Sequence, residues 1–317
     1  MTWKNVQPTF SVIIPTYNRA SLLGRAIRSV LTQTFKDYEL LVIDDASSDD
    51  TKNVVQSFND ERIIYIRREQ NGGSSATRNT GIKQARGRYI SFLDDDDEYL
   101  PDFLAETYQR FETLPGSVGF IGSGIRVVGE RSGKEIFLRN QIPAKPKISN
   151  REELYLSCLK QLPFGTGWGV TFRPSCLDSV GLFDEALRTD VDRDFILRLV
   201  RYFDYDVIDK VLVKVHRHDG PKVTTYGPTK ARSYEQLINK NFSALFSNPQ
   251  LWAEWHYKTG WLHYHSGESQ LGRKFMLTGL RRYPYHLKSW VGLILFETFK
   301  SKGPKVHQSL ARMWSKS

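Results

Sequence analysis

The chain has 317 residues, 40% of them hydrophobic and 25% charged, which suits one large core, or a core with a smaller helical annex, and excludes extended disorder. Its two cysteines, Cys158 and Cys176, are too few for a disulfide framework or a zinc site, and its longest apolar run, 291–296, is far shorter than the roughly 18 residues that span a bilayer. We therefore expect a soluble protein of the reducing cytoplasm, with a formal net charge of +10 that suits either an anionic partner or a solubilising surface.

The first 130 residues alternate short apolar runs with amphipathic segments. Runs rich in β-branched and aromatic residues predict strands at 10–15, 38–44, 62–68 and 88–94. Apolar residues at helical spacing predict helices between them, at 20–34, 50–58 and 74–86. Strand and helix repeated in this order predict an α/β fold with a mostly parallel, Rossmann-like central sheet flanked by helices.

The rest of the chain divides into a mixed part and a helical part. We expect strands within 117–139, 167–173 and 205–215, and helices at 150–160 and 190–203. From about residue 229 onward only helical spacing is present. The predicted domains are accordingly a catalytic domain at 1–225 and a basic, aromatic-rich helical extension at 226–317.

Parallel sheets of this kind bind ligands beyond the carboxyl ends of their strands. The turns at 15–19, 44–49, 69–73 and 94–98 should therefore open on one rim of the sheet. The last of these turns lies in "FLDDDDEYLP" (92–101), where four aspartates and a glutamate follow an apolar strand. Adjacent carboxylates repel, so this cluster is either a solvated loop or a site for a hard cation such as Mg²⁺ or Mn²⁺. In an extended chain Asp94 and Asp96 point the same way, and Asp97 can turn back toward them.

Five segments taken together resemble the inverting family 2 glycosyltransferases with a GT-A fold. They cover roughly residues 8–220 in that family's order and spacing, and each is weakly specific alone. The segments are "IIPTYNR" (13–19), "VIDDASSDDT" (42–51), "NGGSSATRNTG" (71–81), "FLDDDDEYLP" (92–101) and "GLFDEALRTDVDRDFILRL" (181–199).

The resemblance implies a site for a nucleoside-diphosphate sugar and a cofactor, Mn²⁺ or Mg²⁺. The residues implied to bind the donor are Pro15, Thr16, Tyr17, Arg19, Asp45, Arg78, Asp94 and Asp95. Tyr17 would lie against the base, and Asp45 would accept a hydrogen bond from it. Asp94 and Asp96 would form the family's metal-binding pair, with Asp97 and His218 as further candidate ligands. His218 is as well explained as an ordinary surface histidine.

The family also uses a carboxylate base in an acidic motif just before a helix. Inversion requires such a base to take the proton of the acceptor hydroxyl. "TDVDRDF" (189–195) matches with Asp192 as the base, but Val191 replaces the usual Glu, so Asp190 is a rival. The other interpretation is that these aspartates favour the dipole at a helix N-terminus.

The acceptor site and the C-terminal region carry weaker signals. Gly167 and Trp168 in "LPFGTGWGVTF" suggest a flexible wall with a stacking platform for the acceptor, although Trp168 could equally be a core residue. Residues 221–317 hold 15 Lys and Arg against 4 Asp and Glu. This excess fits an anionic acceptor, an anionic membrane touched peripherally at the inner face, or a solubilising helix surface. The same helices offer a surface for self-association.

The sequence thus predicts a metal-dependent glycosyltransferase, of hexosyl or N-acetylhexosaminyl type, that moves a sugar from a UDP-sugar to a cell-surface glycan, polysaccharide or lipid-linked acceptor. A nucleotidyltransferase acting on sugar phosphates is one alternative, but "IIPTYNRAS" offers no Gly-rich phosphate loop with a lysine. A non-catalytic glycan or nucleic-acid binding module is the other, although we expect no nucleic acid. Salt-sensitive nucleic-acid binding without metal-dependent UDP binding would favour the binding module.

Overall fold

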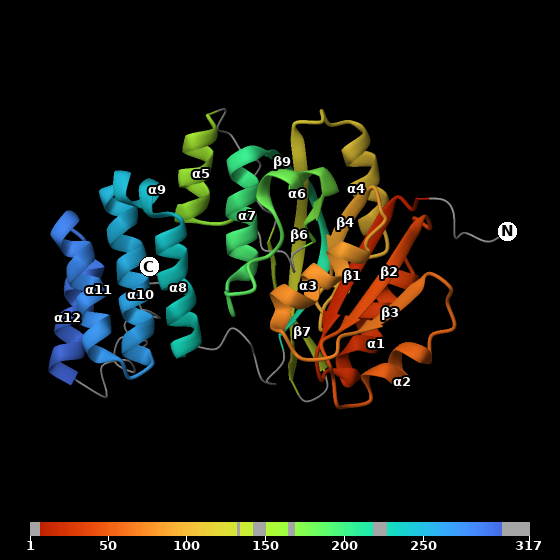
Figure 1. Ribbon diagram of the computed structural model, residues 1–317, viewed down its shortest axis with the longest axis horizontal. Helices are drawn as coiled ribbons and strands as arrows, with labels where there is room; N and C mark the ends of the chain where they lie inside the picture. Colours follow the sequence, from red (N-terminus) through yellow and green to blue (C-terminus); the bar gives the residue numbers. More distant parts are fainter. Residues whose placement is uncertain (1–6, 132–133, 142–149, 164–168, 218–226, 300–317) are drawn as a thin grey trace. The chain divides into compact units, whose positions relative to one another are not determined.

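The computed structural model of the protein describes residues 7–131, 134–141, 150–163, 169–217 and 227–299 (Figure 1). Its contacts divide the chain into two compact units. Unit 1 comprises Met1–Ala186 and Val191–Gly220, and unit 2 comprises Leu187–Asp190 and Pro221–Ser317. Four residues just before helix α7 therefore belong with the C-terminal helices.

Unit 1 contains the sheet and the helices that alternate with it. In chain order its elements are β1 (Phe10–Thr16), α1 (Ala20–Leu31), β2 (Tyr38–Asp44), α2 (Thr51–Gln56), β3 (Ile63–Arg67), α3 (Gly73–Gln84), β4 (Tyr89–Phe92), β5 (Glu98–Tyr99), α4 (Phe103–Glu112), β6 (Val118–Arg131), β7 (Lys134–Gln141), α5 (Arg151–Lys160), β8 (Thr171–Phe172), the short 3₁₀ helix η3 (Pro174–Cys176), α6 (Leu177–Val180), α7 (Val191–Tyr202) and β9 (Asp204–Arg217). Every strand and helix predicted for this part of the sequence is present within a few residues of its expected bounds.

The sheet has the order β3-β2-β1-β4-β8-β6-β9-β5, with β7 paired to β6. Strands β1 to β4 are parallel, as predicted, and β1, β2 and β3 lie side by side in Figure 1. Beyond β4 the sheet becomes mixed, because β8 runs antiparallel to both β4 and β6. The α/β fold class is confirmed. The parallel run predicted from the sequence covers β1 to β4, and β6 and β9 form a second parallel pair in the mixed half.

Burial follows the pattern that the sequence indicates. All seven residues of β2 are buried, as expected of a parallel strand covered on both faces. In α1, Leu23, Ala26, Ile27 and Val30 are buried at i, i+3, i+4 and i+7, so the helix presents one apolar stripe to the sheet. These residues and the strands they cover belong to one continuous core. This core fixes the carboxyl ends of β1 to β4 at one edge.

Gly81 lets α3 approach the sheet closely. A Cβ atom at Gly81 would lie 2.6 Å from Cγ2 of Ile13, a residue that is fully buried in β1. We expect Gly81→Ala to lower the free energy of unfolding by about 1–3 kcal/mol through overpacking. Gly24 in α1 is the matched control, because its nearest neighbour would be Val54 at 3.8 Å, an ordinary contact. Gly24→Ala should raise the free energy of unfolding by up to ~1 kcal/mol. Urea unfolding measures both changes, and equal effects would contradict the assignment.

Over residues 227–299, unit 2 consists of helices joined by short turns. Its helices are α8 (Pro228–Lys240), α9 (Phe242–Ser247), α10 (Pro249–His265), α11 (Ser269–Arg282) and α12 (Leu287–Phe299). A second, smaller core of Tyr264, Met276, Leu280, Leu293 and Phe296 joins α10, α11 and α12. Within the described ranges no helix is long and apolar enough to cross a membrane.

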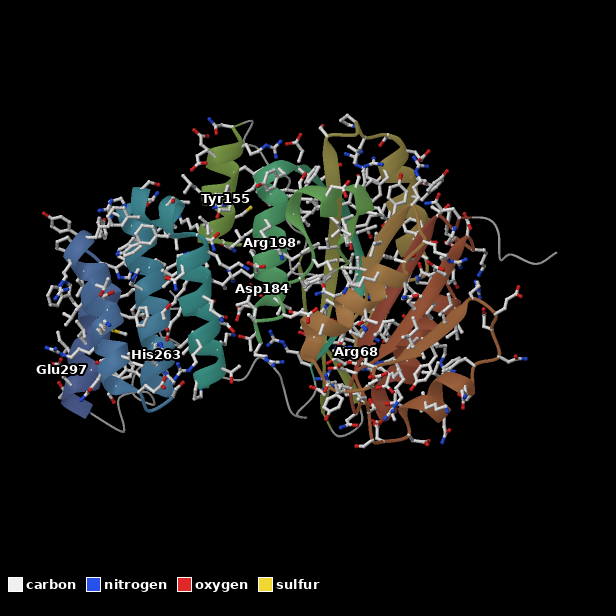
Figure 2. All side chains as sticks on the ribbon, viewed as in Figure 1. Arg68, Tyr155, Asp184, Arg198, His263 and Glu297 are labelled. Atoms are coloured by element: carbon white, nitrogen blue, oxygen red, sulfur yellow. The ribbon has the colours of Figure 1, made fainter. Side chains whose placement is uncertain are left out.

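Contacts between a buried histidine and two glutamates link the helices of unit 2. His263 of α10, labelled in Figure 2, is completely buried, and its Nδ1 lies 2.8 Å from Oε2 of Glu268. Its Nε2 lies 2.7 Å from Oε1 of Glu235 on α8. The histidine therefore connects α10 both to α8 and to the turn before α11. These contacts indicate that His263 has a structural role in unit 2.

Glu254 makes the stability of unit 2 depend on pH. Burial alone would raise its pKa, but a hydrogen bond with His286 and the charges of Lys258 and Lys288 lower it to about 2. Because the folded-state pKa is depressed, the stabilisation is present above the ordinary value of 4.5 and is lost as pH falls toward 2. This pKa shift corresponds to at most ~3 kcal/mol of the free energy of unfolding. We expect a contribution of about 1–2 kcal/mol, because solvent screens these ion pairs.

Glu254→Gln should therefore lower the free energy of unfolding at pH 7 by about 1–2 kcal/mol and flatten its decline below pH 4.5. Glu297 is the matched control, because it pairs with Arg273 at an exposed position of α12 (Figure 2). Glu297→Gln should leave the pH profile unchanged. Urea titrations between pH 7 and pH 3 check both variants, and identical profiles for Glu254→Gln and the unsubstituted protein would contradict the prediction.

Candidate active site

The carboxyl ends of four parallel strands bring the predicted site segments to one rim. Because β1, β2, β3 and β4 are neighbours in register, the turns that follow them lie along one edge of the sheet. The side chains at this rim include Tyr17 and Arg19 after β1, Asp45 after β2, and Arg68 after β3. The acidic run follows β4. The rim predicted from the strand order is therefore present.

The acidic run folds into a turn. The Leu93 N–H donates to the Ile13 carbonyl, which keeps the chain on the sheet up to the first aspartate. The Asp97 N–H then donates to the Asp94 carbonyl at 3.1 Å, which closes the turn. As a result, one carboxylate oxygen from each of Asp94, Asp96 and Asp97 lies within 4.8 Å of the other two. We call these three residues the acidic triad.

Each carboxylate of the acidic triad is held through one oxygen by a fixed donor. The donors are Arg78 Nη2 to Asp94 at 2.8 Å, Arg19 Nη1 to Asp96 at 3.0 Å, and the His216 N–H to Asp97 at 2.9 Å. The three donors come from α3, from the loop after β1, and from β9. The acidic triad is therefore oriented by the fold, as a ligand set needs to be.

Mutual repulsion makes the acidic triad a place for a further cation. Burial raises the pKa of Asp94, and the charges of Asp96 and Asp192 raise it further, against the lowering effect of Arg78. Burial and the charges of Asp94 and Asp96 raise the pKa of Asp97 well above its usual range. A raised pKa means that the surroundings disfavour the ionised carboxylate. A divalent cation bound at the acidic triad would stabilise the ionised carboxylates and lower their pKa values.

Asp95 lies apart from the acidic triad. It is buried, and its Oδ1 accepts a hydrogen bond from Arg19 Nη1 at 2.8 Å. Burial raises the pKa of Asp95 to about 6, although the charge of Arg19 and its hydrogen bond to Asp95 lower it. Arg19 therefore bridges Asp95 and Asp96. Asp95 anchors this arginine beside the acidic triad.

Asp45 and Arg68 form the opposite end of the rim. The Asp45 carboxylate accepts hydrogen bonds from the N–H groups of Gly72 and Gly73, at 3.0 Å and 2.8 Å, and pairs with Arg68. Figure 2 labels Arg68. The Asp45 carboxylate therefore caps the N-terminus of α3, where a negative charge is favourable. The carboxylate expected to bind the base is thus already bonded to the loop that it holds in place. Arg68 extends the wall on which a base could rest.

The loop after β1 exposes Tyr17. Tyr17 is 47% exposed, whereas Thr16 is buried and Pro15 is partly buried. Asn18 adopts a left-handed conformation with φ of 50°, and its side-chain oxygen accepts a hydrogen bond from the Ser48 N–H at 2.8 Å. The loop is therefore tied to the segment after β2. An exposed aromatic ring on a fixed loop is suited to stacking against a planar base.

The two candidate bases fall in different units. Asp190 belongs to unit 2, has a φ of 56°, and accepts a hydrogen bond from the Thr189 hydroxyl. Asp192 belongs to unit 1, in the first turn of α7, and is partly exposed. Its charge is one of those that raise the pKa of Asp94, so the two carboxylates lie in one electrostatic environment. Asp192 is the candidate that the structure associates with the acidic triad.

Two contacts of the site were not predicted from the sequence. Arg25 of α1 donates from Nη2 to the Asp96 carbonyl at 2.8 Å, and His216 Nε2 lies 2.6 Å from Glu98 Oε1. Both contacts join elements that are distant in sequence, so no spacing indicates them. Arg68 could have been predicted, because it directly follows a strand whose carboxyl end faces the rim.

Three predicted residues, Gly167, Trp168 and His218, lie outside the described residues. The described part of the site is suited to two tasks. The acidic triad offers hard oxygen ligands of the kind that Mg²⁺ and Mn²⁺ prefer, so these residues fit such an ion. The partly exposed Asp192 carboxylate offers a base for a hydroxyl proton.

The sequence matches the family model described as Glycosyl transferase family 2 over residues 11–181. An uncharacterized glycosyltransferase of Rickettsia typhi is 31% identical over 242 residues, which cover 75% of this chain and 72% of that protein. The GalNAc(5)-diNAcBac-PP-undecaprenol beta-1,3-glucosyltransferase of Campylobacter jejuni is 47% identical over 106 residues, or 32% of this chain and 34% of that protein.

Solved structures show the same fold at low sequence identity. S. aureus TarS 1-349 in complex with UDP-GlcNAc has a TM-score of 0.60 at 17% identity, covering 86% of this chain and 89% of that one. The mannosyltransferase PcManGT from Pyrobaculum calidifontis, in complex with GDP-Man and Mn²⁺, has a TM-score of 0.56 at 17% identity and covers 99% and 89%. The family match ends before Asp190 and Asp192, so the candidate bases lie outside it.

Proposed function

The chain belongs to glycosyl transferase family 2, and we propose that it transfers a sugar from a UDP-sugar to a glycan acceptor with inversion at the anomeric carbon, using Mn²⁺ or Mg²⁺. The observation that carries this proposal is the acidic triad at the carboxyl end of β4, with the charge of Asp192 acting on one of its members. A cation site and a separate carboxylate base are the two groups that inverting transfer from a diphosphate requires.

In this proposal Asp192 acts as the general base. The bond between the anomeric carbon and the diphosphate oxygen breaks, and the acceptor oxygen bonds to the same carbon from the opposite face. The acceptor proton passes to the Asp192 carboxylate. Inversion requires the base to lie on that opposite face. Asp190 stays the rival base, and its place in unit 2 leaves Asp192 as the better supported of the two.

The acidic triad would hold the divalent ion. When bound, such an ion neutralises the charge that grows on a departing diphosphate. Arg78 and Arg19 hold Asp94 and Asp96 in place and bring positive charge to the same region. Both arginines therefore suit a role in binding the diphosphate as well as in orienting the carboxylates.

The nucleotide would lie along the rim from Tyr17 to Arg68. Tyr17 offers an exposed ring for the base, and Asp45 and Arg68 form a charged wall beside it. The two structural neighbours were solved with UDP-GlcNAc and GDP-Man, so both nucleotides are compatible with this fold. We propose UDP as the nucleotide of this chain, and a hexose or N-acetylhexosamine as the sugar.

For the acceptor we propose a cell-envelope glycan or polysaccharide, carried on a lipid at the cytoplasmic face of a membrane. The Campylobacter relative is named for an acceptor on undecaprenol diphosphate, and it is 47% identical in the matched segment. An anionic acceptor of this kind suits the excess of Lys and Arg in residues 221–317. Peripheral contact with the membrane and self-association of the helices are parts of this proposal that can be tested separately.

A thermal-shift screen tests the proposal. UDP-, GDP- and dTDP-sugars are each added to the protein with and without Mn²⁺. We expect a UDP-sugar to raise the melting temperature only when the metal is present, because the diphosphate binds through the ion. Stabilisation by a GDP-sugar instead would overturn the choice of nucleotide. No shift with any donor would overturn the metal-dependent donor site itself.

A further inference from the structure

Glu98 ends the acidic run of the sequence but is not a member of the acidic triad. It begins β5, a strand of two residues that pairs antiparallel with β9 and places Glu98 opposite Lys214. Because residues two apart on a strand point to the same face, His216 lies on the face of Lys214 and diagonal to Glu98. The Glu98 carboxylate can therefore reach both side chains of β9.

Side chains from α1 and β9 meet at the Glu98 carboxylate. Its Oε1 lies 2.6 Å from Nε2 of His216, 3.3 Å from Nζ of Lys214 and 4.0 Å from Nε of Arg25. None of the four side chains is more than 27% exposed, and that of His216 is 3% exposed. Solvent therefore screens these contacts less than it screens ion pairs on the open surface.

Two partners of Glu98 also hold the turn that carries the acidic triad. The His216 N–H donates to Oδ1 of Asp97 at 2.9 Å, and Nη2 of Arg25 donates to the Asp96 carbonyl at 2.8 Å. The backbone pairing of β5 with β9 is only two residues long, so it gives the turn few hydrogen bonds to β9. The contacts of Glu98 add the missing constraint, because they tie the end of the turn to β9 through His216 and to α1 through Arg25.

We propose that Glu98 is a positioning residue for the divalent-ion site, and that it orients Asp96 and Asp97 through Arg25 and His216. This inference rests on the proposed function, because it takes the acidic triad as the site of the ion. Glu98 acts on the ligands through their partners and does not itself bind the ion. Residues that orient metal ligands in this way strongly affect the affinity for the metal.

A rival explanation is that Glu98 favours a cation only through its negative charge, and two substitutions separate the explanations. Glu98→Gln keeps the length of the side chain, and the amide can donate to or accept from His216, but the charge is lost. Glu98→Asp keeps the charge but is one methylene shorter, so it cannot keep its contacts with both Arg25 and His216, which lie on different elements. Positioning and charge therefore predict opposite orders of Mn²⁺ affinity for these two variants.

Titration of the full chain with Mn²⁺, alone and with UDP, tests the proposal. The electron paramagnetic resonance signal of free Mn²⁺ measures binding without any turnover. We expect Glu98→Ala to weaken Mn²⁺ binding about 10–100-fold, the loss typical of outer-shell partners. Glu98→Asp should weaken it at least about fivefold, and Glu98→Gln by no more than about threefold, because only Gln keeps the hydrogen bonds.

Glu106→Ala is the matched control, because Glu106 of α4 pairs with another lysine of β9, Lys210. This variant should bind Mn²⁺ like the unsubstituted protein. The comparison of Gln with Asp decides the proposal even if Glu98→Ala does not fold. Unchanged Mn²⁺ affinity in Glu98→Ala, or weaker binding by Glu98→Gln than by Glu98→Asp, would overturn the proposal and leave the proposed function in place. If the unsubstituted protein binds no Mn²⁺ in either condition, the proposed function fails and this inference fails with it.

Discussion

Asp192→Asn should abolish sugar transfer while leaving donor binding intact. We expect kcat to fall about 10³-fold, within the range that a positioned general base contributes, because Asn cannot accept the acceptor proton. The affinity for UDP in the presence of Mn²⁺ should change by no more than a few fold, since Asp192 is not a member of the acidic triad. Turnover measurements and isothermal titration with Mn²⁺ and UDP separate the two effects.

Asp190→Asn is the matched control for this prediction. Asp190 lies two residues before Asp192 but belongs to the other contact unit. Its variant should keep turnover within about threefold of the unsubstituted protein. If Asp190→Asn loses activity and Asp192→Asn keeps it, the base is Asp190. If both variants bind the donor normally and both keep full turnover, the proposed base chemistry is wrong.

The sequence could predict the fold because the strands of unit 1 are locally specified. The run 38–44 is apolar throughout and the structure buries all seven of its residues, so pattern and burial agree. Helix α1 carries its apolar residues at helical spacing and buries them. The family and the GT-A type of fold, expected from five short segments, are confirmed by the family match and by the solved structures.

The details of the site depend on contacts that the sequence does not encode locally. The sequence predicts that Asp94 and Asp96 converge and that Asp97 turns back toward them, and the structure groups all three. The bond from the Asp97 N–H that closes this turn could not be predicted. The resemblance predicts that Asp45 accepts a hydrogen bond from the nucleotide base. In the structure its carboxylate caps α3 by accepting hydrogen bonds from two backbone N–H groups. Arg25 reaches the Asp96 carbonyl from a helix. Only the packed fold brings these partners together.

Removal of the divalent metal should abolish donor binding. We expect EDTA to abolish donor binding, and Asp96→Asn to lower the affinity for Mn²⁺ at least about 100-fold, since loss of an outer-shell partner alone costs 10–100-fold. The reason is that Asp96 contributes an oxygen to the acidic triad, and an amide is a weaker ligand for a hard cation. Titration of Mn²⁺ in the presence of UDP measures this affinity.

Asp95 provides the control because it adjoins Asp96 in sequence but lies outside the acidic triad. Its carboxylate is buried and accepts a hydrogen bond from Arg19, so it holds the arginine in place. Asp95→Asn should therefore keep Mn²⁺ affinity within a few fold and weaken diphosphate binding through Arg19. The opposite pattern, with Asp95→Asn losing metal and Asp96→Asn retaining it, would mean that the turn presents the other carboxylate to the donor. In that case the acidic triad would be a structural cluster, and the diphosphate would depend on Arg19 and Arg78 for its positive charge.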